Sequence, residues 1–112
     1  MSEFSIQSSL HGKVAIVTIA GRVDSATAPT MDAELEKTAS ENKKIVLDLK
    51  DVEYMSSAGV RAIVKALRHA HKRRGGLKLA RPSDPIMEIL RTIGMMEVVQ
   101  VYPSVDEAVA SF

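Results

Sequence analysis

The sequence predicts an α/β fold, in which helices cover a mixed and mostly parallel β-sheet. First, two almost continuously apolar runs rich in β-branched residues, at 14–19 and 45–49, have the pattern of strands buried on both faces. Second, an amphipathic helical pattern separates the two runs, as in a crossover between parallel strands. Third, the 112 residues, of which 46% are hydrophobic and 26% charged, suffice for one domain with its own core. We therefore expect a single domain over residues 1–112 with the element order β-β-α-β-α-β-α-β-α.

The N-terminal part is expected to be a hairpin followed by a helix. Residues 4–7 indicate a short strand, and a turn signal at 11–13 joins it to the apolar run at 14–19. Residues 25–38 have a helical pattern, with Thr27 as a suitable N-cap and Pro29 in the first turn, where its missing N–H costs little. The apolar stripe of this helix consists of Ala28, Met31, Leu35 and Ala39.

The middle of the chain is expected to form a strand, a loop and a long helix. The strand covers residues 45–49, the loop residues 50–55 and the helix about 58–74. The dipeptide Gly75–Gly76 ends this helix, and one of the two glycines is expected in the left-handed conformation that commonly follows a helix.

The last third of the chain is expected to add two strands and two helices. A strand at 77–80 precedes a helix that is capped by Ser83 and stopped by Gly94. The final strand covers residues 98–102, and a capping-box sequence at 104–107 opens a short terminal helix. Open α/β sheets place their sites at the carboxyl ends of strands, so we expect the loops at 21–24 and 55–59 to be neighbours.

The segment Ser56, Ser57, Ala58 and Gly59 is the leading candidate for a functional site. It follows a buried strand and opens a long helix, and its small residues allow another chain to approach closely. A phosphate on a serine here would lie near free helix N–H groups and the positive end of the helix dipole. The competing interpretation is that both serines merely cap the helix, because serine is a preferred cap at any helix start.

Three segments resemble the STAS family, the sulfate transporter and anti-sigma factor antagonist domains. Residues 45–49 together with 52–61 resemble the family signature, residues 21–24 with 27–28 resemble its first loop, and residues 93–95 resemble its late helix-end turn. The resemblance covers nearly the whole chain. It implies a STAS-like fold, which agrees with the element order expected from the pattern of strands and helices.

The resemblance also implies a phosphorylation site. In stand-alone family members, the serine two residues before the loop glycine is phosphorylated by a partner anti-sigma kinase, and alignment on Gly59 places this acceptor at Ser57. Many sporulation and stress-response members have Asp-Ser-Ser-Gly here, whereas this chain has Ser56 in place of the aspartate and Ala58 in place of the second serine. Ser56 is therefore kept as a less favoured second acceptor.

The function implied by the resemblance is that of an anti-sigma factor antagonist. Without phosphate, the protein is expected to bind an anti-sigma factor serine kinase and displace a sigma factor, and a serine phosphatase would reverse the modification. The ATP and magnesium belong to the kinase, so the protein needs no cofactor of its own. The alternative is a sensory or scaffold STAS protein, without a sigma target, in a partner-switching or stressosome-like assembly.

Partner contacts are expected from the two loops, the start of the long helix and the late turn. The expected residues are Arg22, Asp24, Ser56, Ser57, Ala58, Gly59, Arg61 and Met95. Asp24 has two interpretations that remain open. Its carboxylate either pairs with a basic residue of the kinase, as the resemblance implies, or favours the first helix through the helix dipole.

Other function classes find little support in the sequence. A nucleophile elbow, a glycine-rich phosphate loop and cysteine are all lacking, and His69 and His71, two apart, point in different directions on a helix. The protein is therefore not expected to be an enzyme or a metal protein. The basic run 68–74 complements the negative end of its helix, and with few aromatic residues we expect no direct nucleic-acid binding. The chain has no signal-peptide pattern and no long apolar run, which predicts a cytoplasmic location without a membrane partner.

Overall fold

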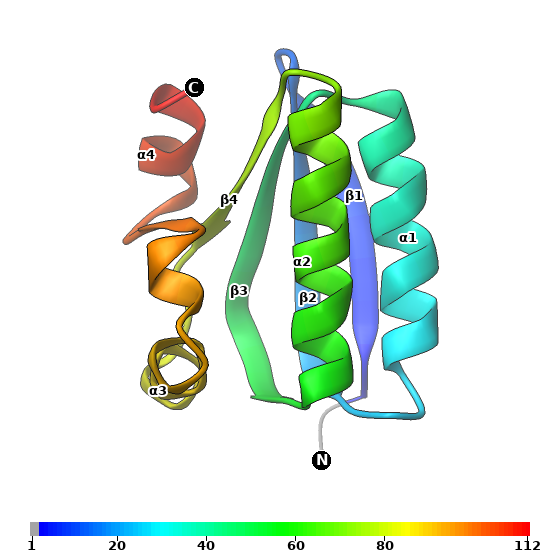
Figure 1. Cartoon of the computed structure of the whole chain (residues 1–112), viewed down its shortest axis with the longest axis vertical. Helices are drawn as coiled ribbons and strands as arrows, with labels where there is room; N and C mark the ends of the chain where they lie inside the picture. The colour runs from blue at the N-terminus through cyan, green and yellow to red at the C-terminus, as the bar shows by residue number, and fades with distance from the viewer. Residues whose placement is uncertain (1–2) are drawn as a thin grey trace.

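The computed structural model describes residues 3–112 as one sheet of five strands in the order β1-β2-β3-β4-β5, flanked by helices (Figure 1). The elements are β1 (Ser5–His11), β2 (Val14–Val23), α1 (Ala28–Glu41), β3 (Lys44–Met55), α2 (Ser57–Lys72), β4 (Gly76–Ala80), α3 (Asp84–Thr92), the 3₁₀ helix η1 (Met95–Glu97), β5 (Gln100–Tyr102) and α4 (Val105–Ala110). β1 pairs with β2 in the antiparallel sense, and all other neighbouring strands are parallel. The predicted fold class and element order are confirmed.

The helices cover both faces of the sheet. α1 and α2 lie side by side on one face (Figure 1), where alternate residues of β3, Ile45, Leu47 and Leu49, are fully buried beneath them. Val46, which points the other way, packs with residues of β2 and α4 in a second apolar cluster. Burial of both sides explains why the central strands have almost continuous apolar runs.

The expected loop at 50–55 is wrong, because β3 continues as a strand to Met55. Its pairing with β2 contains two register shifts, one between Thr18 and Ala20 and one between Gly21 and Arg22. Such bulges bend a strand without ending its pairing. The two strands therefore reach the candidate site together and end as a pair.

The end of α2 also differs from the prediction. The left-handed residue is Arg74, with φ of 62°, and neither Gly75 nor Gly76 has a positive φ. Gly75 is required for another reason, since a Cβ there would overlap the backbone carbonyl of Lys43. Further along the chain, Gly94 ends α3 as expected, with φ of 77°, and η1 then delays the start of β5.

Candidate functional site

The site lies at the carboxyl ends of β2 and β3, where the two predicted loops are neighbours. Val23 and Met55 are paired across the two strands, and the backbone N–H of Ser56 donates a hydrogen bond of 2.7 Å to the carbonyl of Val23. The predicted proximity of the segments 21–24 and 55–59 is thus confirmed.

Gly59 sets the position of the start of α2. It is buried in the first turn, and a Cβ added to it would lie 2.6 Å from Cγ1 of Val23 and 2.8 Å from Cγ of Met55. Only a residue without a side chain lets the helix lie this close to the strand ends. The first turn of α2, with Ser57, is thereby held against the end of the sheet.

The two serines are in different environments. Ser56 occupies the N-cap position, but its hydroxyl oxygen is enclosed and has no hydrogen-bond partner in residues 3–112. Ser57 is the first residue of α2 and is exposed. α2 has neither a side-chain cap nor an acidic residue in its first turn. Its first N–H groups and the positive end of its dipole are therefore not neutralised by a side chain of α2.

Ser57 lies at an apolar groove between α2 on one side and the end of α3 with η1 on the other. The groove has a volume of about 310 Å³ and is lined by Ser57, Val60, Val64, Ile89, Ile93 and Met95. Met95 is almost fully buried, whereas Ile93 is 50% exposed. Val60, Val64 and Ile89 recur with other apolar residues at helical spacing, a pattern that is typical of core residues. The only sequence signal for their role in a groove is the position of Ile93 beside the helix-ending Gly94.

Asp24 organises the turn that precedes α1. Its Oδ1 accepts hydrogen bonds from the backbone N–H groups of Ala26 at 3.0 Å and Thr27 at 3.1 Å. The Thr27 bond foremost, and then the Ala26 bond, lower the pKa of Asp24 below its ordinary value. Thr27 occupies the expected N-cap position, but its hydroxyl makes no cap hydrogen bond and donates instead to the carbonyl of Arg22 at 2.9 Å. Among the described residues no donor reaches Oδ2 of Asp24, so that oxygen stays open to a partner.

The expected partner residues do not all lie on one surface. Arg22 stacks on Tyr54, with its guanidinium carbon 4.5 Å from the ring centroid. Because side chains alternate along a strand, Arg22 points to the opposite face of the sheet from Val23, which contacts α2. Ala58 and Arg61 line a separate cavity of about 360 Å³ between α1 and α2. The structure therefore groups Ser57 with Met95 on one flank of α2 and places Ala58 on the other, while Arg61 lines this cavity and also a second one along the exposed side of α2.

The part of the chain that the structure describes contains no cluster of three or more side chains able to hold a metal ion. Within that same part, none of the helices is long and apolar enough to cross a membrane.

Comparison with known proteins gives consistent matches along the chain. A model of the STAS domain matches residues 5–108. The anti-sigma-B factor antagonist of Bacillus subtilis is 29% identical over 85 residues, which are 76% of this chain and 78% of that protein. The structure of an anti-sigma factor antagonist from Mycobacterium paratuberculosis superposes with a TM-score of 0.86 at 19% identity, over 97% of this chain and 93% of the other. The phosphorylated form of the Bacillus cell fate determinant SpoIIAA superposes with a TM-score of 0.76 at 15% identity, over 96% and 98%.

Proposed function

The chain belongs to the STAS domain family, and from this premise we propose that it is an anti-sigma factor antagonist controlled by phosphorylation of Ser57. Relatives with that name are regulatory binding proteins rather than enzymes. The observation that carries the proposal is that Ser57 is exposed at a helix start without a side-chain cap, beside an apolar groove.

In the proposed cycle, the form without phosphate binds an anti-sigma factor serine kinase through the groove. The kinase supplies ATP and magnesium. Oγ of Ser57 attacks the γ-phosphorus, the bond to the β–γ bridging oxygen breaks to release ADP, and the hydroxyl proton passes to a base of the kinase. A serine phosphatase then hydrolyses the phosphoserine. We place this cycle in the cytoplasm, without a nucleic-acid or membrane partner.

Phosphorylation would release the partner by changing the charge of the binding surface, without a change in the fold. A phosphoserine has a charge of about −1.5 to −2 at neutral pH, and here it would stand at the edge of an apolar groove. A partner that covers the groove would have to bury this charge against an apolar surface, which is costly. The partner is therefore expected to dissociate.

The geometry favours Ser57 over Ser56 as the acceptor. A kinase needs an accessible hydroxyl, and the Ser56 hydroxyl oxygen is enclosed whereas Ser57 is exposed. Asp24, with one free carboxylate oxygen on a neighbouring loop, and Gly59, which holds the helix start, are proposed to support the same interface.

The test is phosphorylation in a purified system. The protein is incubated with a serine-kinase anti-sigma factor of the same genome and Mg-ATP, and the phosphate is located by mass spectrometry, with Ser57→Ala and Ser56→Ala as matched variants. We expect one phosphate, lost only in Ser57→Ala, and weaker kinase binding afterwards. Modification of Ser56 would contradict the choice of acceptor. An active kinase that leaves the protein unmodified would favour the scaffold alternative.

A further inference from the structure

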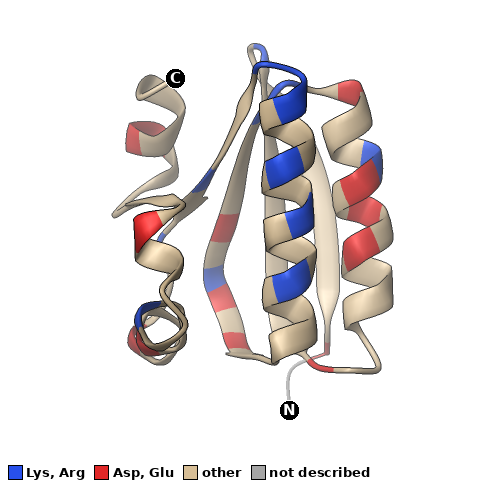
Figure 2. Ribbon diagram, viewed as in Figure 1, with Lys and Arg blue, Asp and Glu red and all other residues tan. Residues whose placement is uncertain are grey.

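A row of cations runs along the exposed side of α2. Arg61, Lys65, Arg68 and Lys72 are all exposed, and they recur at intervals of four, three and four residues (Figure 2). This spacing keeps them on one side of a helix over a length of about 16 Å. The row begins one helical turn after Ser57 and continues to the other end of the helix.

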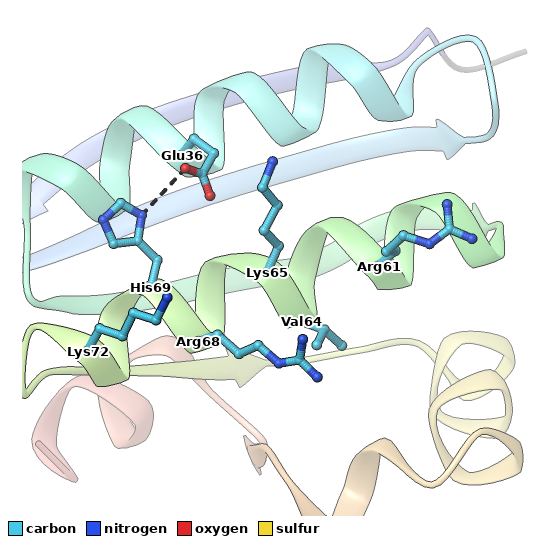
Figure 3. Close-up of a pocket in the computed structure, with 7 residues that line it drawn as sticks. All are labelled: Glu36, Arg61, Val64, Lys65, Arg68, His69 and Lys72. Carbon is cyan, nitrogen blue, oxygen red and sulfur yellow. Dashed lines mark ion pairs between the residues drawn. The ribbon is translucent and has the colours of Figure 1, made fainter.

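Only part of this charge is neutralised by α1. Lys65 pairs with Asp32 at 3.3 Å, and His69 approaches Glu36 at 3.5 Å (Figure 3). In the described part of the chain, no carboxylate lies within ion-pair distance of Arg61, Arg68 or Lys72. Arg61, Arg68 and Lys72, without Lys65, are called the basic row below. These three cations are available to an anion of another molecule.

The basic row is continuous with the groove beside Ser57. A cavity of about 580 Å³ along α2 is lined by Glu36, Arg61, Val64, Lys65, Arg68, His69 and Lys72. Val64 lines both this cavity and the apolar groove of Ser57. Ile93, which lines the groove, is an exposed apolar side chain, and so are Met96 and Val98 further along the chain. One surface of α2 thus combines an apolar strip with a parallel line of unpaired cations.

We propose that this surface binds an acidic amphipathic helix of a partner protein. The apolar side of that helix would contact Val60, Val64 and Ile93, and its carboxylates would face the basic row. This inference rests on the proposed function, because it names the chemistry of the partner that the Ser57 groove accepts. An α-helix has a diameter of about 10–12 Å, so one helix lying along α2 could contact the apolar groove and the basic row at the same time.

The charges around the row favour such a protein segment over a nucleic acid or a membrane. Asp32 and Glu36 of α1, which lie at 3.3 Å from Lys65 and 3.5 Å from His69, place carboxylates on the flank of α2 opposite the apolar groove. A phosphate backbone or an anionic lipid surface wide enough to reach the whole row would also meet these carboxylates. In addition, the chain is only 4% aromatic, which leaves few side chains for base stacking.

The proposed partner chemistry explains how a phosphate at Ser57 would act. The phosphate would add negative charge at one end of a surface that selects carboxylates. It would also compete for Arg61, which is four residues further along the same helix and extends toward its N-terminal end (Figure 3). The release of the partner would then be electrostatic and should weaken as salt increases.

The test compares two variants with the same change in net charge. The row variant carries Arg61→Glu, Arg68→Glu and Lys72→Glu, and the control carries Lys13→Glu, Lys37→Glu and Lys43→Glu, all exposed positions outside α2. Affinity for the serine-kinase anti-sigma factor is measured at low and high salt after circular dichroism has verified folding. We expect binding at least about tenfold weaker in the row variant at low salt and within threefold of the parent in the control. If the row variant does not fold, the corresponding three glutamine substitutions take its place.

The outcomes separate this inference from the proposed function. If the kinase phosphorylates Ser57 and binds the row variant as well as the control, the basic row is not a partner surface and the phosphorylation switch stands. If the parent binds no serine-kinase anti-sigma factor, both proposals fail. Binding of a single-stranded oligonucleotide or of anionic vesicles that depends on the row would overturn the choice of an acidic helix.

Discussion

Phosphorylation of Ser57 is expected to stabilise the folded domain. The proposed acceptor is the first residue of α2, and this helix has no acidic residue in its first turn and no side-chain cap. A negative charge at a helix N-terminus contributes about 0.3–1 kcal/mol. An ion pair with Arg61, four residues later, contributes about 0.2–0.5 kcal/mol. The free energy of unfolding should therefore rise by about 1 kcal/mol, which in a domain of this size raises Tm by roughly 4 °C.

Thermal unfolding followed by circular dichroism measures this effect. The phosphorylated and unphosphorylated forms are compared at low and high salt, and Arg61→Ala is carried through the same series. The Tm gain should shrink in high salt, because both contributions are electrostatic, and Arg61→Ala should lose about a third of it. A phosphorylated form with a lower Tm than its parent would refute the reasoning. It would mean that the phosphate disrupts the start of α2.

Three further predictions follow from single contacts. Gly59→Ala should lower the free energy of unfolding, measured in urea, by about 1 kcal/mol. Overpacking against Val23 and Met55 costs about 1–3 kcal/mol, and the better helix propensity of alanine returns up to about 1 kcal/mol. An unchanged unfolding midpoint would disprove the close approach of Gly59 to the two side chains. Arg81→Ala leaves the buried carboxylate of Asp48 without the guanidinium that contacts it at 3.0 and 2.6 Å. The free energy of unfolding in the same assay should fall by about 1–3 kcal/mol, a range reduced because Arg81 is partly exposed. Removing both charged groups should cost less than the sum of the two single changes. The pKa of Asp24 is lowered in the folded state, so its contribution to stability is present above the ordinary value of 3.8 and is lost as the pH falls below it. Asp24→Asn keeps an oxygen acceptor for the turn and should reduce this acid dependence, and weaker kinase binding at unchanged Tm would show that the partner contacts the carboxylate.

The strands and helices were predictable where burial is simple. The runs at 14–19 and 45–49 are apolar because both of their sides are covered, so their pattern alone identified them. The continuation of β3 to Met55 was not predictable, because polar residues are typical of a loop when the pairing with β2 is unknown. The pairing contains register shifts, which depend on both strands and cannot be predicted from the sequence of either strand alone.

The candidate site was predictable only in its topology. Parallel strands place their carboxyl ends at one edge, so the neighbouring loops followed from the element order. The groove did not follow from the pattern, because Ile93 and Met95 are distant from Ser57 in the sequence and reach it only through the packing of α3 and η1. Only the family resemblance had placed Met95 among the partner contacts. The spacing of the basic row is visible in the sequence. The dense run of basic residues at 68–74, however, is explained by the negative end of the helix dipole, so the spacing along the helix was not interpreted as a surface.

The position of Ser57 determines how a phosphate on it would act in the proposed switch. Gly59 holds the first turn of α2 against Val23 and Met55, and Ser57 already faces solvent, so a phosphate requires no rearrangement to be accommodated. A packed helix start of this kind has no evident second arrangement to which the phosphate could shift it. A partner would then detect the phosphate through the changed charge of the surface and not through a changed backbone. The backbone of the phosphorylated protein should therefore superpose on that of the unphosphorylated protein around 56–61, and backbone amide shifts in NMR should change only near Ser57 and Arg61.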